Sequence, residues 1–350
     1  MVFDLNDIET KKLLAIFAQH EKNIDYLIYL CDLIWQKPVT SGDSIKGGNQ
    51  YQKRDFLFNE LEKVRPFPNE FIKKNIKWDS QLLRVDDFLN NPYLKALSNL
   101  SFNKDDWALT NNKLSAYSIF PYEEEYHYGP NYNLKMNLGY FDKDYIYPSI
   151  SLCENEWMSL NPYEIRTMEN ATITAKGKVL TLGLGLGYYA YIVHLKEEVK
   201  EVHIVEMDKE LINLFNEYLL PLFPYKEKIH IHKADAFTFV NSVKDTDYDF
   251  IFSDLWHDVG DGLPMYLTLK ETFNKFKYTK CHYWIEGDLV TYLRMIVISV
   301  LKDLYYQQDD NDDDELRRKI KTNLNKYSIK NSYDIDALLS IRGLNKLLFK

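Results

Sequence analysis

The apolar residues in the first part of the chain recur at the spacing of an α-helix. In Glu21–Gln36 they follow a period of 3.6 residues, and Pro38 ends the pattern. Similar spacing predicts helices over Asp55–Val64 and Gln81–Leu89. We therefore interpret residues 1–116 as a helical N-terminal cap or substrate region.

The pattern changes at Tyr117. Between Tyr117 and Ile150 the chain is rich in tyrosine and is interrupted by turn-forming residues, which favours short strands and hairpins. We assign residues 117–175 to this β-hairpin-rich segment.

From Gly177 onward, short apolar runs alternate with helical patterns. The runs that predict strands are Lys178–Leu182, Glu201–Val205, Ile229–His232, Tyr248–Phe252 and Cys281–Ile285. Strands that alternate with helices imply an α/β fold, a Rossmann-like, doubly wound and mostly parallel sheet that binds ligands beyond the carboxyl ends of its strands. We place this domain at residues 176–305 and a C-terminal extension at residues 306–350.

One apolar stretch, Val179–Leu195, is 17 residues long and carries no formal charge. Its length is just below that of a membrane-spanning helix. Glycines in its middle would each weaken a helix by roughly 1 kcal/mol, but they suit a tight turn between a strand and a helix. The stretch therefore predicts a strand, a glycine loop and a helix rather than a membrane span.

Composition narrows the classes of partner. The chain of 350 residues has 43 basic and 52 acidic residues, a net charge of −9, which disfavours general binding to nucleic acid or to an anionic membrane. Its three cysteines fit neither a disulfide framework nor a zinc site. The acidic N-terminus lacks an export signal, so we expect a cytoplasmic protein that acts on a small molecule, and a homo-oligomer is compatible with this sequence.

The glycine loop contains Gly183, Gly185 and Gly187 in a G-x-G-x-G pattern. A dinucleotide fingerprint requires a further glycine where this chain has Tyr188, so NAD is the weaker interpretation. Taken alone, the loop is also compatible with a purely structural turn.

With an acid at the end of the next strand, this loop resembles those of class I S-adenosylmethionine-dependent methyltransferases and of their relatives, the spermidine synthases. The resemblance covers about Gly177–Gly287. It implies that the glycine loop lies against the methionine half of S-adenosyl-L-methionine and that Glu206 accepts the ribose hydroxyls. It also implies that Asp235 and Ala236 read the adenine edge and that Asp254 faces the reacting centre.

A polar cluster follows the fourth predicted strand. Asp254 and His257 are candidate catalytic residues, because an imidazole can accept a proton near neutral pH and a carboxylate can bind an amine or tune the histidine. Trp256 and Asp258 are candidate substrate-binding residues, since an indole and a carboxylate can both hold a cationic group. The alternative is a polar loop with a core tryptophan.

The remaining histidines favour structural roles. These include His230 and His232, which alternate on a predicted strand. No His, Cys or Asp grouping in the sequence has a spacing typical of a metal site, so we expect no metal.

The residues at two positions help to distinguish methyl transfer from aminopropyl transfer. Thr181 stands where methyltransferases commonly carry an acid, and Leu186 stands where spermidine synthases carry an aspartate that helps to bind the amine. A leucine cannot accept hydrogen bonds from an ammonium group, so we expect an S-adenosylmethionine-dependent methyltransferase that acts on an unidentified small molecule.

Two other readings stay open. Glu154–Glu164 and the run Asp254–Asp258 resemble the spermidine-synthase-like branch, which implies an aminopropyltransferase that uses decarboxylated S-adenosylmethionine and a polyamine. A non-catalytic, cofactor-binding regulatory module is the second alternative, favoured by Thr181 and Leu186.

Overall fold

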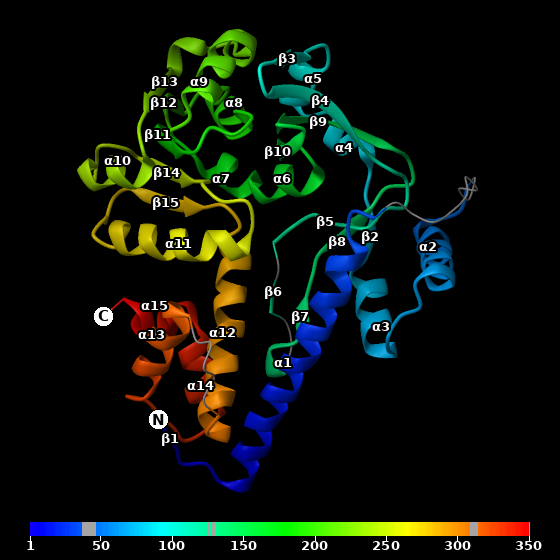
Figure 1. Ribbon diagram of the computed structural model, residues 1–350, viewed down its shortest axis with the longest axis vertical. Helices are drawn as coiled ribbons and strands as arrows, with labels where there is room; N and C mark the ends of the chain where they lie inside the picture. Colours follow the sequence, from blue (N-terminus) through cyan, green and yellow to red (C-terminus); the bar gives the residue numbers. More distant parts are fainter. Residues whose placement is uncertain (37–46, 125, 128–129, 309–313, 350) are drawn as a thin grey trace. The chain divides into compact units, whose positions relative to one another are not determined.

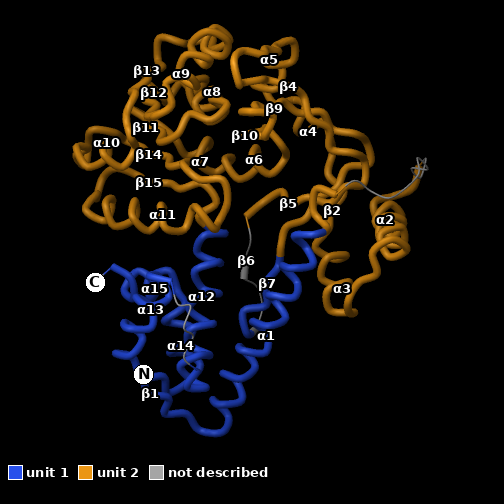
Figure 2. The backbone as a smooth tube through the Cα atoms, in the orientation of Figure 1, with its two compact units in different colours: residues 1–32, 125–135, 287–350 blue, residues 33–124, 136–286 orange. Residues whose placement is uncertain are grey.

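Contacts between residues divide the chain into two units, each described here by itself (Figures 1 and 2). The computed structural model describes residues 1–36, 47–124, 126–127, 130–308 and 314–349. The helical unit consists of Met1–Asp32, Glu125–Lys135 and Gly287–Lys350, and the sheet unit consists of Leu33–Glu124 and Met136–Glu286. The helical unit thus joins three stretches that are far apart in sequence. The four consecutive segments expected from the sequence stay a prediction.

A five-stranded parallel sheet forms the centre of the sheet unit. Its strands are β11 (Gly177–Leu182), β12 (Val199–Glu206), β13 (Ile229–Lys233), β14 (Phe250–Ser253) and β15 (Lys280–Tyr283). They lie in the order β13-β12-β11-β14-β15, and every neighbouring pair is parallel. This order reverses direction at β11, which confirms the expected Rossmann-like, doubly wound α/β fold. The carboxyl ends of β11 and β14 therefore meet at the switch point, where such sheets bind ligands.

The central strand is apolar because it is enclosed on both faces. Val179, Leu180 and Leu182 are fully buried, as expected for the middle strand of a parallel sheet. The helices around this sheet are α6 (Pro162–Thr167), α7 (Glu169–Thr174), α8 (Tyr188–His194), α9 (Lys209–Leu214), α10 (Ala236–Ser242) and α11 (Val259–Phe273). A π-helical turn, η2 (Phe215–Leu219), continues α9, and two 3-10 turns follow, η3 (Leu220–Leu222) and η4 (Lys226–Lys228). Within the core, Tyr189 of α8 stacks on Phe252 of β14 at 4.2 Å between ring centroids.

Smaller sheets and helices precede the parallel sheet. Their strands are β2 (Ser80–Leu82), β3 (Phe102–Lys104), β4 (Trp107–Leu114), β5 (Phe120–Pro121), β8 (Leu138–Tyr140), β9 (Tyr145–Leu152) and β10 (Asn155–Ser159). Their helices are α2 (Gln50–Val64), α3 (Glu70–Asp79), α4 (Val85–Leu89) and α5 (Pro92–Leu97). Strands β10-β9-β4-β3 form an antiparallel sheet, and β2-β8-β5 form a mixed one. The expected order, a helical N-terminal region followed by a short β-rich segment, is confirmed. The strands begin before Tyr117, however, because β2, β3 and β4 lie within the region expected to be helical.

Two expected helices differ from the structure in their bounds. The segment Gln81–Leu89 is not one helix, because β2 occupies Ser80–Leu82 and only Val85–Leu89 is helical. Pairing of β2 with β8 satisfies the backbone there, which a local helical pattern does not reveal. The first helix, α1, runs over Asp7–Leu33, so it begins earlier than Glu21 and ends before Gln36.

The helical unit contains α1, α12 (Glu286–Tyr306), α13 (Glu315–Leu324), α14 (Ser332–Leu339) and α15 (Ile341–Leu348). It also contains the strands β1 (Val2–Phe3), β6 (Tyr126–His127), β7 (Leu134–Lys135) and β16 (Ser328–Ile329), and the 3-10 turn η1 (Pro130–Tyr132). Strand β1 pairs in parallel with β16, and Phe17 of α1 contacts Tyr305 of α12 at 5.8 Å between ring centroids. No helix among the described residues is both long and apolar enough to cross a membrane.

Candidate functional site

A cavity of about 940 Å³ opens at the carboxyl ends of the parallel strands, within the sheet unit. Most of the residues singled out in the sequence line it, namely Gly183, Gly185, Glu206, Asp235, Ala236, Asp254, Trp256 and His257. A cavity of this size is within the usual range for small-molecule sites. Gly187 and Asp258 do not line it. Gly187 instead begins α8, and Asp258 caps α11 by accepting hydrogen bonds from the backbone amides of Gly260 and Asp261.

The glycine loop forms one wall of the cavity in a conformation that requires glycine. Gly183, Gly185 and Gly187 have φ angles of +97°, +48° and +75°. A Cβ atom on Gly183 would lie 1.9 Å from the carbonyl oxygen of Asp254, so the loop packs directly on the end of β14. On Gly185 the nearest atom would be Sδ of Met158, at 2.2 Å.

Glu206 joins the end of β12 to this loop. One carboxylate oxygen accepts the backbone N–H groups of Met207 and Asp208, each at 2.8 Å, and the other accepts that of Leu184 at 3.2 Å. These bonds fix the side chain at the cavity wall. A carboxylate has about four acceptor positions, so Glu206 retains the capacity to accept hydroxyl groups as well.

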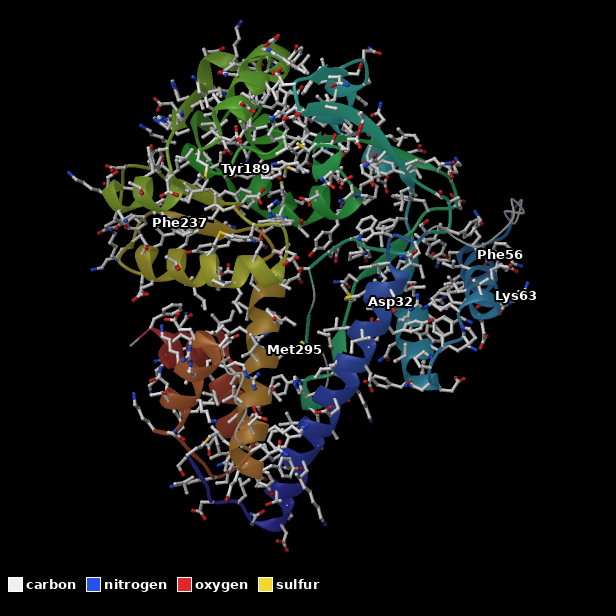
Figure 3. All side chains as sticks on the ribbon, viewed as in Figure 1. Asp32, Phe56, Lys63, Tyr189, Phe237 and Met295 are labelled. Atoms are coloured by element: carbon white, nitrogen blue, oxygen red, sulfur yellow. The ribbon has the colours of Figure 1, made fainter. Side chains whose placement is uncertain are left out.

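Asp235 and Ala236 lie where α10 begins after β13. The Asp235 Oδ1 accepts both the backbone N–H (2.8 Å) and the hydroxyl (2.7 Å) of Thr238, so this side chain caps the helix. Ala236 is buried, and Phe237, labelled in Figure 3, follows it on the same helix and lines the cavity. This wall offers a small side chain and an aromatic ring, which suits a flat ring such as a purine.

Three of the acidic residues that line the cavity, Asp254, Glu164 and Glu156, differ in their exposure. Burial raises the pKa of Asp254, at the end of β14, to about 7. Glu164 lies in the first turn of α6, which Asn161 caps by accepting the Glu164 N–H at 3.0 Å. Burial, and then the negative charges of Asp254 and Glu156, raise the pKa of Glu164 well above its ordinary value. Glu156 is exposed and accepts hydrogen bonds from Asn112 and from Ser149.

One oxygen of the Glu164 carboxyl is unpaired among the residues that the structure describes. Its Oε2 atom is buried and has no hydrogen-bond partner among the described residues. A buried carboxylate oxygen without a hydrogen-bond partner destabilises the folded protein. Because the neighbouring charges of Asp254 and Glu156 are negative, a cationic ligand would be the complementary partner for Glu164.

Aromatic side chains line the same cavity as these carboxylates. Trp256 and Trp284 are buried, and the Trp284 indole donates to the Thr167 hydroxyl at 2.8 Å. The exposed Trp157 contacts the His257 ring edge-on at 5.3 Å. His257 is itself exposed, and its Nδ1 lies 3.1 Å from a carboxylate oxygen of Asp261. Its position at the rim leaves Asp254 as the more enclosed proton acceptor.

Sequence reasoning missed Glu164, Glu156 and Trp157 as site residues. The available signal was the run Glu154–Glu164, whose resemblance to the spermidine-synthase-like branch was noted without assigning roles to its residues. That run forms β10 and the start of α6, and the fold brings it against the glycine loop, where Met158 Sδ lies 3.1 Å from the Leu186 amide nitrogen.

A protein-family model matches the part of the chain that forms most of the parallel sheet. The spermine/spermidine synthase domain matches residues 164–280, about a third of the chain. No curated protein sequence matches the chain.

Solved structures similar to this chain include three spermidine synthases. That of Thermotoga maritima shows 16% identity over 43% of this chain and 55% of its own, with a TM-score of 0.31. A probable spermidine synthase of Corynebacterium glutamicum shows 20% identity over 31% and 44%, with a TM-score of 0.26. A spermidine synthase in complex with the transition-state analogue AdoDATO shows 16% identity over 43% and 57%, with a TM-score of 0.33. The chain thus spans about half the length of these proteins.

The domain match corrects the expected reaction. It supports a transferase with the fold that spermidine synthases share with class I methyltransferases, but it contradicts the methyltransferase interpretation. The argument for methyl transfer was the missing carboxylate at Leu186. That side chain is fully buried and does not line the cavity, whereas Glu156 and Glu164 bring carboxylates from a different segment.

Proposed function

We propose that this protein is an aminopropyltransferase that transfers the aminopropyl group of decarboxylated S-adenosylmethionine to a small polyamine. The observation that carries the proposal is the buried Oε2 of Glu164, which has no hydrogen-bond partner within the described part of the chain and lies in the same cavity as Asp254 and the glycine loop. An ammonium group of the acceptor would supply the missing positive charge and would lower the pKa of both carboxyls.

The cavity residues fit an S-adenosyl co-substrate. Glu206 would accept the ribose hydroxyls, Phe237 and Ala236 would contact the adenine, and the glycine loop would admit the chain that carries the sulfonium. The different exposure of these carboxylates suits an elongated cation. Glu164 and Asp254 would hold one amine at the inner end, and the exposed Glu156 would attract the other near the mouth, beside Trp157.

The reaction requires that the acceptor nitrogen, the propyl carbon and the leaving sulfur be aligned, and it requires one proton acceptor. The acceptor nitrogen attacks the propyl carbon bound to the sulfonium, a C–N bond forms, the C–S bond breaks, and neutral methylthioadenosine leaves. The nitrogen must lose one proton, and we assign its removal to Asp254, whose pKa of about 7 suits a general base near neutral pH. Trp256, buried beside the cavity, would help to exclude water.

The direct test offers the purified protein both co-substrates. Incubation with decarboxylated S-adenosylmethionine and either putrescine or spermidine should yield an aminopropylated amine and methylthioadenosine in equal amounts, measured by mass spectrometry. S-adenosylmethionine in place of the decarboxylated compound should yield no methylated amine. Tight binding of the co-substrate without any transfer to these amines would refute the proposal and favour the regulatory module.

The rate should depend on pH through Asp254. Because its folded-state pKa is about 7, the carboxyl is increasingly protonated as pH falls below 7, and kcat/KM for the amine should fall with it. The acceptor amine titrates at higher pH, so the profile is best compared with that of Asp254→Asn. The residual activity of that variant should lack the inflection near pH 7, and an unchanged inflection would assign it to another group.

A further inference from the structure

A second group of titratable side chains lies on one face of the parallel sheet and has no part in the proposed transfer. Glu201 and His203 are two residues apart on β12, and His230 and His232 are two residues apart on β13. His203 is the direct cross-strand partner of His230. Because side chains alternate along a strand, all four project from the same face.

The contacts within this group are close. His203 Nε2 lies 3.0 Å from a carboxylate oxygen of Glu201, and the rings of His203 and His230 are 4.7 Å apart between centroids. One potential ligand atom from each of Glu201, His203 and His230 lies within 4.8 Å of the others. In a tetrahedral zinc site with bonds of about 2.0 Å, ligand atoms are separated by roughly 3.3 Å. His230 is exposed, so a change of its rotamer can bring a ring nitrogen closer to the other two ligand atoms.

Neighbouring side chains hold the ring of His203 in one orientation, as is common for histidines that bind a metal. Its other nitrogen, Nδ1, lies 2.8 Å from Nε2 of His232, and Tyr248 packs edge-on against its ring at 5.3 Å. Metal-binding histidines are commonly held by such a bond from the second ring nitrogen. A nearby cation that opposes a metal is Lys178, whose Nζ lies 3.3 Å from a carboxylate oxygen of Glu201.

We propose that Glu201, His203 and His230 form a binding site for a divalent transition-metal ion of the zinc type, with water in the fourth position and His232 as a positioning residue. Imidazole nitrogens with one carboxylate select such ions over magnesium, which prefers oxygen ligands. A bound ion would tie β12 to β13. The proposal is independent of the transfer reaction.

The site can be tested by isothermal titration calorimetry, in which zinc chloride is added to the metal-free 350-residue protein. We expect one zinc ion per chain and no binding of magnesium under the same conditions. His230→Gln is the main variant because this side chain is exposed, and it should weaken zinc binding at least tenfold, as should Glu201→Gln. His232→Ala should weaken it by roughly tenfold through the loss of its bond to His203.

Two variants serve as controls. His257→Gln removes an exposed histidine outside the group and should leave zinc affinity unchanged, and Lys178→Met should leave it equal or stronger. Zinc should also raise the unfolding midpoint of the wild type but not that of His230→Gln. Absence of saturable zinc binding, or equal affinity in wild type, His230→Gln and Glu201→Gln, would overturn the proposal and leave a hydrogen-bonded histidine cluster.

Discussion

Asp254→Asn should lower kcat for aminopropyl transfer by about 10²–10⁴, the contribution typical of a general base. The asparagine keeps the size of the side chain but cannot take the proton from the attacking nitrogen. Glu164→Gln should act mainly on the acceptor and raise its KM by about 10- to 100-fold, the cost of losing a charged hydrogen bond. Steady-state kinetics with each substrate varied in turn separates the two effects.

The matched control for these variants is Glu210→Gln. Glu210 also lines the cavity but is exposed, so the same chemical change should leave both constants near those of the wild type. Equal losses in Glu164→Gln and Glu210→Gln would mean that the overall charge of the cavity, and not the buried carboxyl, attracts the amine.

Thermal unfolding shows whether Asp254→Asn loses activity because the base is missing or because the protein is less stable. The folded-state pKa of Asp254, about 7, is higher than the usual value of about 3.9 for an unfolded chain. The stability that its protonated form contributes is therefore present below about pH 4 and is lost as pH rises to about 7. Asp254→Asn does not ionise, so above pH 7 it should unfold at a higher temperature than the wild type. A lower unfolding temperature would indicate structural damage.

Gly183→Ala should reduce affinity for the S-adenosyl co-substrate at least tenfold and should also lower kcat. A Cβ atom at this position would lie 1.9 Å from the Asp254 carbonyl oxygen, so the backbone that carries the base must move. The φ angle of +97° adds strain of about 1–3 kcal/mol for a residue other than glycine. Calorimetric titration with the co-substrate and thermal unfolding measure the two consequences.

Gly47→Ala provides the control for strain alone. Gly47 has a φ angle of +93°, but an added Cβ would meet no atom of the described residues within 4 Å. This variant should therefore share the backbone strain and retain co-substrate affinity. Wild-type binding by Gly183→Ala would show that the loop tolerates a side chain and has no close contact with a ligand.

The parallel sheet and the glycine loop could be predicted because their signals are local. A short apolar run such as Val179–Leu182, bounded by glycines, favours a buried central strand, and three closely spaced glycines permit the left-handed turn that follows. The acids at the carboxyl ends, including Glu206 and Asp254, then reach one cavity through the topology alone.

The choice of reaction could not be predicted from a single position. Leu186 shows only that one carboxylate is absent from the loop, whereas the position of Glu164 depends on how β10 and α6 fold back against that loop. The histidine cluster could not be predicted for a similar reason, because cross-strand pairing brings its members together. His203 and His230 are distant in sequence, so no ligand spacing was visible before the register of β12 and β13 was known.

The discontinuous helical unit has a consequence for synthesis on the ribosome. Helix α1 buries Leu13, Ile16 and Phe17 within a unit whose other large part begins only at Gly287. At typical elongation rates, roughly 10 to 50 s separate the emergence of these two parts. During that interval the residues of the sheet unit are being synthesised, while the apolar face of α1 lacks the partners that are made last. The apolar face of α1 therefore stays without these partners until the residues after Gly287 are made, and exposed hydrophobic surface of this kind makes a nascent chain prone to aggregation.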